Sequence, residues 1–230
     1  MTVSAVVVSH GHARELERSL PALAPQVDEL VVIANLPGSV NRGIAETGGD
    51  YVLVANPDAV PEPGAVAALV AHADATPRCG IAGPQLLWPD GTWQPSRRRF
   101  PTVRGTIVRR TPLRLLRPPY RHQAEHYHLD ERPREPVPAD WLLGAFLLQR
   151  RTMLDELGGW DAGYRHYVED IDLCYRAAKA GWERWYVPAA VVRHAYAAVI
   201  DRRFLSRHTI WHARGMLRFL RKHPERLAAL

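Results

Sequence analysis

The sequence predicts an α/β domain with a mostly parallel central sheet flanked by helices, and three short apolar runs near the N-terminus are the basis for it. Residues 3–9 (VSAVVVS), 29–33 (ELVVI) and 50–55 (DYVLVA) are rich in β-branched side chains. Near-continuous apolar runs of this length are typical of strands that are buried on both faces of a parallel sheet. Between the first two runs, three leucines recur at helical spacing. The order strand, helix, strand predicts a βαβ unit with parallel strands.

The remaining segments continue this alternation. We expect, in chain order, a helix at 64–74, two strands joined by a tight Asp90-Gly91 turn within 81–94, a strand followed by a helix within 141–159, a helix at 169–181, strands at 183–187 and 191–194, and a basic helix at 201–223. A chain of 230 residues is long enough for one substantial core and short for two. We therefore expect one domain over residues 1–200 and a helical tail over 201–230.

Composition restricts the class of protein. No run approaches the roughly 20 apolar residues that span a bilayer, and the N-terminus lacks a signal-peptide pattern, so we expect a cytoplasmic protein. Cys79 and Cys174 lie far apart with neither metal-motif nor redox-motif spacing, which predicts buried free thiols. The formal charge of +6 favours phosphate-bearing partners.

Two segments carry much of the positive charge. Residues 95–138 are dense in arginine, proline and histidine and too long for a passive connection, so we expect a mobile functional loop. Its arginines, Arg97 and Arg98 among them, would either attract an acceptor diphosphate or form a solvated basic surface. The tail at 201–230 alternates apolar and basic residues, which suits docking on the core combined with attraction to an anionic membrane surface.

Acidic residues and one histidine are the candidates for chemistry. Asp58 follows the apolar run 50–55, at the strand edge where α/β proteins bind ligands, although a turn or helix-capping role is the alternative. Glu169, Asp170 and Asp172 open a predicted helix, a position that the helix dipole also favours without any catalytic role. His194 ends a β-branched run, where a neutral imidazole can bind a divalent metal.

Four segments together resemble glycosyltransferase family 2, the GT-A-fold enzymes, and in particular its bacterial rhamnosyltransferase-like branch. They are AVVVSHGHARELERSLPAL, GDYVLVANPDAVPEPGAVAALV, GIAGPQLLWPDGTWQPSRRRFPT and GAFLLQRRTMLDELGGWDAGYRHYVEDIDLCYRAAKAGWERWYVPAAVVRH. They cover most of residues 3–194. The resemblance implies a GT-A fold and an inverting transfer of a sugar from a nucleotide-diphosphate donor.

The resemblance also implies roles for single residues. Asn56-Pro57-Asp58 stands in the place of the family's Asp-X-Asp motif, so Asp58 would hold Mg²⁺ or Mn²⁺ against the donor diphosphate, with Asn56 beside it. His194 matches a later histidine that completes the metal site in some members. Asp170 matches the general base that deprotonates the acceptor hydroxyl, with Glu169 as its neighbour.

The acceptor side follows from the same resemblance. Trp160 and Asp161 fall where the family contacts the acceptor, and the tryptophan face is expected to stack on a sugar ring. With Arg97 and Arg98, they would hold a glycan or a polyprenyl-diphosphate-linked acceptor. Such an acceptor would place the protein in peripheral contact with the inner face of the cell membrane.

The nucleotide side departs from the family pattern. Family members carry an Asp that contacts the nucleotide base after the second strand, whereas Ala34 stands there in this chain, followed by Asn35 and, later, Asn41. The first strand ends in Ser9-His10, where a tyrosine is more common in the family. We expect Ser9, His10, Asn35 and Asn41 to contribute to donor binding. Because the family's base-contacting Asp and its tyrosine are replaced, the sequence does not identify the nucleotide or the sugar of the donor.

Other functions fit less well. No G-x-G-x-x-G follows the first strand, which argues against a dinucleotide-dependent oxidoreductase. A nucleic-acid-binding module would leave the acidic cluster unexplained and would need aromatic RNA-binding signatures. The serious alternative is a glycosyltransferase-like scaffold or partner subunit with a degenerate nucleotide site, suggested by Ala34.

Overall fold

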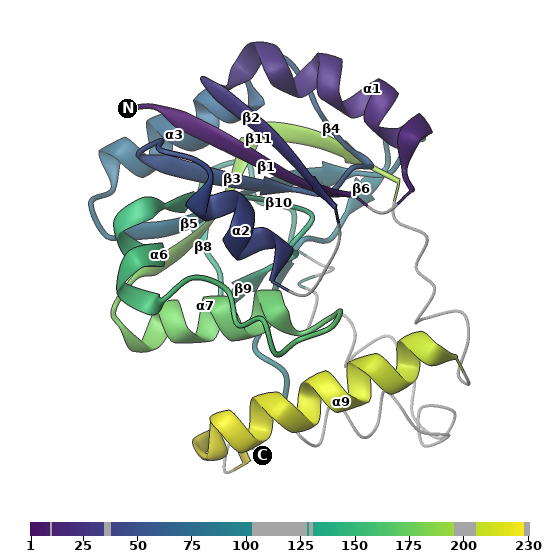
Figure 1. Cartoon of the computed structure of the whole chain (residues 1–230). Helices are drawn as coiled ribbons and strands as arrows, with labels where there is room; N and C mark the ends of the chain where they lie inside the picture. Colours follow the sequence, from purple (N-terminus) through teal and green to yellow (C-terminus); the bar gives the residue numbers. More distant parts are fainter. Residues whose placement is uncertain (10, 35–37, 103–127, 129–130, 196–205, 228–230) are drawn as a thin grey trace.

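A mixed sheet is the centre of the molecule (Figure 1). The computed structural model describes residues 1–9, 11–34, 38–102, 128, 131–195 and 206–227. Within them, the large sheet has the strand order β2-β1-β3-β10-β5-β11-β4, with β6 beside β5 and β8 beside β11. Its strands are β1 (Val3–Ser9), β2 (Glu29–Ala34), β3 (Tyr51–Ala55), β4 (Ala59–Pro61), β5 (Cys79–Leu87), β6 (Trp93–Gln94), β8 (Val137–Pro138), β10 (Phe146–Arg150) and β11 (Glu183–His194). A second, two-stranded sheet joins β7 (Arg97–Arg98) to β9 (Trp141–Leu142).

The predicted parallel core is present. Strand β1 pairs in parallel with both β2 and β3, and β11 pairs in parallel with β5. Strand β10 is different, because it lies antiparallel between β3 and β5. The two strands expected at 183–187 and 191–194 are one strand, β11, whose pairing with β5 changes register between Val187 and Val191. Pairing with β5 resumes after this irregularity, so the extended chain does not end there.

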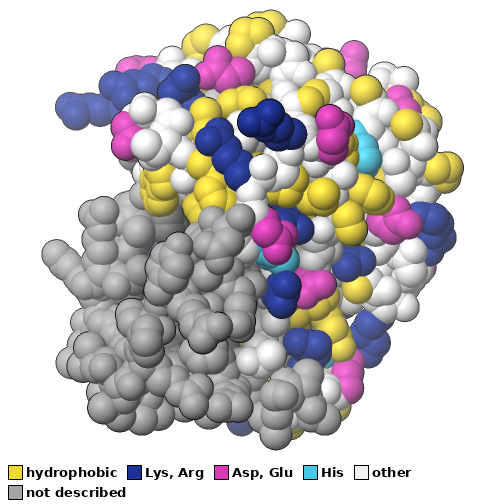
Figure 2. All heavy atoms as spheres, turned by 180° about the vertical axis from the view of Figure 1, so that it is seen from behind, with side chains coloured by type: hydrophobic (Ala, Val, Ile, Leu, Met, Phe, Trp, Pro, Cys, Tyr) yellow, Lys and Arg dark blue, Asp and Glu magenta, His cyan; other side chains and the backbone are white. Residues whose placement is uncertain are grey.

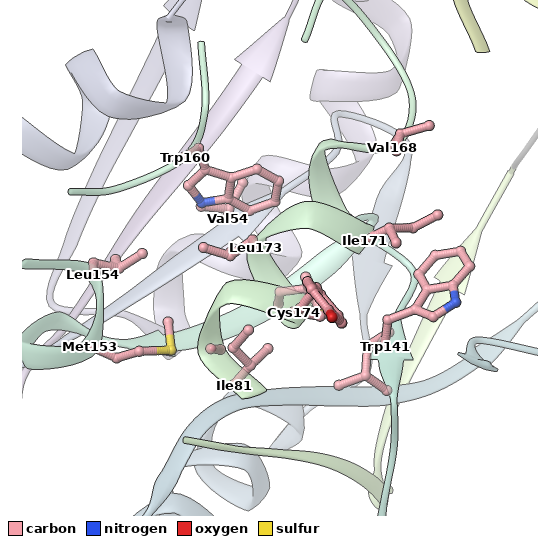
Figure 3. Packing of buried hydrophobic residues seen from close by; sticks show 14 of the residues in the cluster. Val54, Ile81, Trp141, Met153, Leu154, Trp160, Val168, Ile171, Leu173 and Cys174 are labelled. Atoms are coloured by element: carbon pink, nitrogen blue, oxygen red, sulfur yellow. The ribbon is translucent and has the colours of Figure 1, made fainter. Parts of the chain in front are cut away.

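Helices cover both faces of the sheet, and each face has its own core. They are α1 (Ala13–Leu23), α2 (Ser39–Ala45), α3 (Ala65–Ala75), α6 (Arg151–Leu157), α7 (Glu169–Lys179) and α9 (Arg207–Lys222), with 3₁₀ turns η1 (Ala24–Gln26) and η3 (Pro224–Leu227). Helices α1 and α3 pack on one face, where Leu23 and Leu69 are fully buried. Helices α2, α6 and α7 cover the other face (Figures 1 and 3).

Helix α9 packs on the outer side of α7 (Figure 1). It adds Met216 and Phe219 to the core under α2, α6 and α7, which we call the second core. The Phe219 ring lies 5.5 Å from the ring of Tyr175 in α7, in an edge-on arrangement. The predicted docking of the tail on the core is therefore present. Helix α9 begins after Ser206, and residues 201–205 of the expected helix lie outside the described residues.

Several smaller predictions are also confirmed. Strands β5 and β6 form the expected antiparallel hairpin, with Gly91 at a φ of 83° in its turn. Cys79 and Cys174 are free and buried. The segment at 95–138 contributes the short strands β7 and β8, whereas 103–127 and 129–130 lie outside the described residues, so the predicted mobility of this loop stays a prediction.

Positive charge is unevenly distributed over the described residues. On the face shown in Figure 2, basic and acidic side chains are interspersed among hydrophobic ones. Helix α9 carries five Lys or Arg residues and no Asp or Glu. The other described residues together carry a small net negative charge. No helix of the described residues is both long and apolar enough to cross a bilayer.

Candidate active site

The carboxyl end of β3 meets the turn that precedes β10. The backbone N–H of Asn56 donates to the carbonyl of Ala145 at 2.8 Å, and its own carbonyl accepts from Ala59 at 3.1 Å. These bonds place Asp58 in the turn between β3 and β4, with a quarter of its side chain exposed. This is the sheet edge at which α/β proteins bind ligands.

Asp58 and His194, which are 136 positions apart in the sequence, lie together. Strand β4 pairs with β11 so that Ala59 faces His194, and the Nε2 atom of His194 lies 3.5 Å from Oδ1 of Asp58. The Nδ1 atom lies 3.0 Å from Oε1 of Gln94. Because a carbonyl oxygen only accepts, Nδ1 carries the proton, and Nε2 presents its lone pair toward the carboxylate.

This pair fits a divalent cation. Burial lowers the pKa of His194, against the raising effect of Asp58, so the imidazole is neutral at physiological pH and able to ligate. A carboxylate oxygen and an imidazole nitrogen that face each other over 3.5 Å suit Mg²⁺ or Mn²⁺ between them. No group of three or more such ligands occurs in the described part of the chain.

Asp170 lies next to the turn that precedes β10. Its Oδ2 accepts a hydrogen bond from the backbone N–H of Gly144 at 3.0 Å, and its Oδ1 accepts from the N–H of Ile171 at 2.9 Å. A Cβ at Gly144 would lie 3.1 Å from the Cβ of Asp170, so a side chain here would force the two residues apart by a few tenths of an ångström. Burial raises the pKa of Asp170, and the Gly144 N–H and the charge of Arg98 oppose the rise.

Glu169, the residue before Asp170, is also perturbed by burial. Burial and the neighbouring Asp170 raise its pKa to about 8. Its Oε2 is buried and has no hydrogen-bond partner among the described residues. A carboxyl group in this state holds a proton at neutral pH, so the pair combines a protonated Glu169 with an ionisable Asp170.

Arg97 and Arg98, which were both expected to bind the acceptor, have different surroundings. The charge of Arg98 acts on both Asp170 and His194, and its guanidinium stacks on Trp141 at 4.9 Å from the ring centroid. Arg98 therefore belongs to the site. Arg97 instead forms an ion pair with Glu131.

Trp160 was expected to present its face to a sugar, whereas its side chain lies in the core. Its side chain is 7% exposed and packs in the second core with Val54 and Leu173 (Figure 3). The indole Nε1 donates to Oε1 of Gln149 at 2.8 Å, which satisfies its polar atom inside the core. Trp160 is thus a core residue in this structure.

Asn41 and Asp161 also serve the fold. The Asn41 side chain accepts from the N–H of Trp160 at 2.8 Å and donates to its carbonyl at 2.6 Å, which ties α2 to this loop. Asp161 accepts from Arg218 at 2.8 Å and from Lys222 at 2.8 Å. Burial raises the pKa of Asp161, but these two cations outweigh it and hold the pKa far below its ordinary value. Both side chains are thus engaged in hydrogen bonds within the chain, and their roles in donor and acceptor binding stay predictions.

The nucleotide side is described only in part. Ser9 ends β1 half-buried and pairs in register with Ala34 at the end of β2. The carbonyl of Ala34 accepts from the Ser39 hydroxyl at 2.7 Å. His10 and Asn35, which were expected to bind the donor, lie outside the described residues.

Two residues of the site were not predicted from the sequence. Gln94, which orients His194, lies in a two-residue strand, and Gly144, which binds Asp170, lies in a turn whose position depends on the antiparallel β10. Only a glycine directly before an apolar run pointed to Gly144.

Comparison with known proteins identifies the family. A family model described as glycosyltransferase-like family 2 matches residues 2–215. The chain belongs to this family. Fold and family were therefore both correctly predicted from the sequence.

Two curated members of the family are similar in sequence. The N-acetylglucosaminyl-diphospho-decaprenol L-rhamnosyltransferase of Mycobacterium tuberculosis is 35% identical over 206 residues, which cover 84% of this chain and 66% of that protein. The rhamnosyltransferase WbbL of Escherichia coli K12 is 42% identical over 81 residues, which cover 35% of this chain and 30% of WbbL. The matched part of the chain thus spans just under two thirds of the mycobacterial relative.

Solved structures share the GT-A fold. GalNAc-T7, solved with UDP, GalNAc and Mn²⁺, superimposes with a TM-score of 0.62 at 17% identity, over 85% of this chain and 44% of that one. A mannosyltransferase from Pyrobaculum calidifontis, solved with GDP-Man and Mn²⁺, gives a TM-score of 0.53 at 14% identity, over 84% of this chain and 56% of that one.

The proton on Glu169 predicts a pH-dependent stability. The unfolded chain releases this proton above the ordinary pKa of 4.5, whereas the folded chain keeps it up to about pH 8. The free energy of unfolding therefore falls as pH rises between these values. A Glu169→Gln variant has no such proton to lose. Between pH 5 and pH 8, its free energy of unfolding should therefore rise by about 1–3 kcal/mol relative to that of the wild type.

Urea unfolding at several pH values measures this difference. Glu17→Gln, at an exposed position in α1, is the matched control and should follow the wild type. Parallel stability curves for Glu169→Gln and the wild type would contradict the protonated state.

Proposed function

We propose that the chain is an inverting glycosyltransferase that moves a sugar from a nucleotide-diphosphate donor to a hydroxyl group of the acceptor. One observation carries this proposal: the turn at Gly144-Ala145 bonds to Asn56 on one side and to Asp170 on the other. The predicted metal ligand and the predicted base therefore share one sheet edge. This arrangement suits a donor diphosphate at Asp58 and an acceptor hydroxyl at Asp170.

The chemistry needs one proton acceptor. In its ionised form, Asp170 takes the proton of the acceptor hydroxyl while the hydroxyl oxygen attacks the anomeric carbon. The bond from that carbon to the diphosphate breaks, and the nucleoside diphosphate departs with the electron pair. A single displacement inverts the anomeric configuration. The Gly144 N–H holds the carboxylate in place, and Arg98 favours its charged form.

Asp58 and His194 are the residues that would hold Mg²⁺ or Mn²⁺. When bound, such a cation neutralises charge on the leaving diphosphate. The chain's own contribution is orientation, because Gln94 fixes the histidine tautomer and the β4–β11 pairing sets the distance to the carboxylate. The Mn²⁺ in GalNAc-T7 and in the archaeal mannosyltransferase supports a divalent cation in this fold.

Rhamnose is the sugar that the relatives favour, since both named proteins are rhamnosyltransferases. The mycobacterial relative acts on a decaprenol-linked diphosphate, so we propose a polyprenyl-diphosphate-linked or related glycan acceptor. We also propose that the 95–138 loop contributes to acceptor binding. These assignments would place the protein at the cytoplasmic face of the membrane.

Helix α9 offers a surface for that membrane. Ile210 and Leu217 are 55% and 49% exposed on its outer side. Arg214 and Arg221 line a hollow of about 570 Å³ near Leu217, which also includes Arg218, Lys222 and Asp161. Exposed apolar side chains among arginines suit an interface of anionic lipid headgroups.

Replacing the base should abolish transfer. In Asp170→Asn the amide cannot take the proton, and we expect kcat to fall by about 10²–10⁴-fold. Donor binding, measured by thermal shift with the nucleotide sugar, should stay close to that of the wild type. In the wild type, kcat should rise with pH through the raised pKa of Asp170. Undiminished turnover in the variant would remove Asp170 from the role of base.

Removing the strand-end carboxylate should remove the metal dependence. We expect Mn²⁺ to strengthen nucleotide-diphosphate binding to the wild type and to have little effect on Asp58→Ala. Calorimetric titration of the nucleotide, with Mn²⁺ or with EDTA, measures both proteins. A wild type that binds equally in both conditions would refute the metal assignment.

Loss of α9 arginines should weaken lipid binding. The double variant Arg214→Gln/Arg221→Gln should bind phosphatidylglycerol vesicles less tightly, by about 1 kcal/mol per charge at low salt. Co-sedimentation measures this binding. The control Arg14→Gln/Arg18→Gln removes the same charge from exposed positions in α1 and should behave as the wild type. Equal losses in the two double variants would indicate a general charge effect instead.

A further inference from the structure

Helix α9 contacts the N-terminal end of α7, the helix that carries the proposed base Asp170. We infer that α9 is a positioning element of the active site, which holds the α7 N-terminus in the geometry that presents Asp170. This inference rests on the proposed function. It assigns a role to Lys222 and Gly215, neither of which touches the reacting groups.

The first contact is a buried ion network on Asp172. The Asp172 side chain is completely buried in the first turn of α7, two residues after Asp170. It accepts from Lys222 at 2.9 Å and from Nε2 of His223 at 2.9 Å, both at the C-terminal end of α9, and from Arg176 at 2.7 Å.

These partners decide the charge of Asp172. Burial alone would raise its pKa, but the bonds from Lys222, His223 and Arg176 lower it below the ordinary value. A buried carboxylate is costly unless it is paired, so its position follows the position of the cations. The end of α9 thereby restrains the first turn of α7.

The second contact is at the turn that enters α7. Tyr167 and Val168 have φ values of 72° and 76°, which is uncommon for residues with a side chain and a genuine outlier for a β-branched one. Val168 is the N-cap of α7, and no side chain caps the helix there. Contacts from outside the turn must therefore hold this conformation.

Helix α9 supplies such contacts. A Cβ at Gly215 would lie 3.0 Å from the carbonyl oxygen of Tyr167 and 3.0 Å from Cγ2 of Val168, so the two backbones approach as closely as glycine allows. The Tyr167 hydroxyl also lies 3.1 Å from Nδ1 of His208. Helix α9 thus packs against both residues of the strained turn.

The contacts converge on Asp170. The carboxylate lies two residues after Val168 and two residues before Asp172, and its bond to the Gly144 N–H is 3.0 Å long. A shift of the α7 N-terminus against β10 would change that bond and the approach to the acceptor hydroxyl. Small misplacements of a catalytic group have large effects on rate.

One variant separates positioning from stability. Gly215→Ala introduces the better helix former into α9 and forces the Tyr167–Val168 turn to give by a few tenths of an ångström. We expect kcat to fall about tenfold or more, with the donor KM unchanged. The control Gly48→Ala has nothing within 4 Å of the new Cβ and should leave kcat at the wild-type value.

A second pair of variants tests the ion network. Lys222→Ala removes one of the cations on Asp172, and Lys222→Arg should restore much of the activity because it returns the charge. Lys179→Ala is the matched control, since Lys179 bonds to Glu225 from the opposite end of α7. We expect kcat to fall in Lys222→Ala alone, whereas nucleotide-dependent thermal shifts should be the same in all of these proteins.

The assay uses the full chain with a water-soluble acceptor analogue in detergent, so membrane binding does not influence the result. Wild-type values of kcat in both Gly215→Ala and Lys222→Ala would overturn the inference. Equal losses of kcat in the matched controls would overturn it too, because the loss would then not be specific to the contacts of α9. Failure of the wild type to transfer any sugar would instead refute the proposed function, so the two failures are distinguishable.

Discussion

Strand β10 lies antiparallel between β3 and β5, and its N-terminal turn therefore sits against the carboxyl end of β3. From that turn, the Ala145 carbonyl bonds to Asn56 and the Gly144 N–H bonds to Asp170. A segment almost 90 residues later in the chain thereby fixes the relation between the Asp58 turn and the α7 N-terminus. If β10 were parallel to β3, its C-terminal end would lie at the site instead, and Gly144 would lie at the opposite edge of the sheet.

Burial acts differently on the three acidic residues at the start of α7. Asp172 is paired with cations from α9 and α7, and its pKa is lowered. Asp170 has backbone donors and a more distant arginine, and its pKa is raised. Glu169 has no partner among the described residues on one oxygen, and its pKa is raised to about 8. The same helical turn thus holds both a structural carboxylate and the groups suited to proton transfer.

Much of the fold could be predicted because the relevant signals are local. The β-branched runs, the Asp90-Gly91 turn and the glycine after α6 all report their own conformation. The pairing of Asp58 with His194 followed only from family resemblance, since strand register is a long-range property. A motif does not tell whether a side chain faces solvent, so the sequence could not show that Trp160 is buried or that Asp161 is paired with Arg218 and Lys222. These contacts come from α2 and α9, which lie far from Trp160 and Asp161 in the sequence.

The stereochemistry of the product tests the central claim most directly. A transfer site with one base and one displacement must invert the anomeric carbon, so NMR of the product from a β-configured nucleotide rhamnose should show an α-linkage. A product with retained configuration would require a covalent or front-face route, and it would contradict the roles that we give to Asp170 and to the site around it.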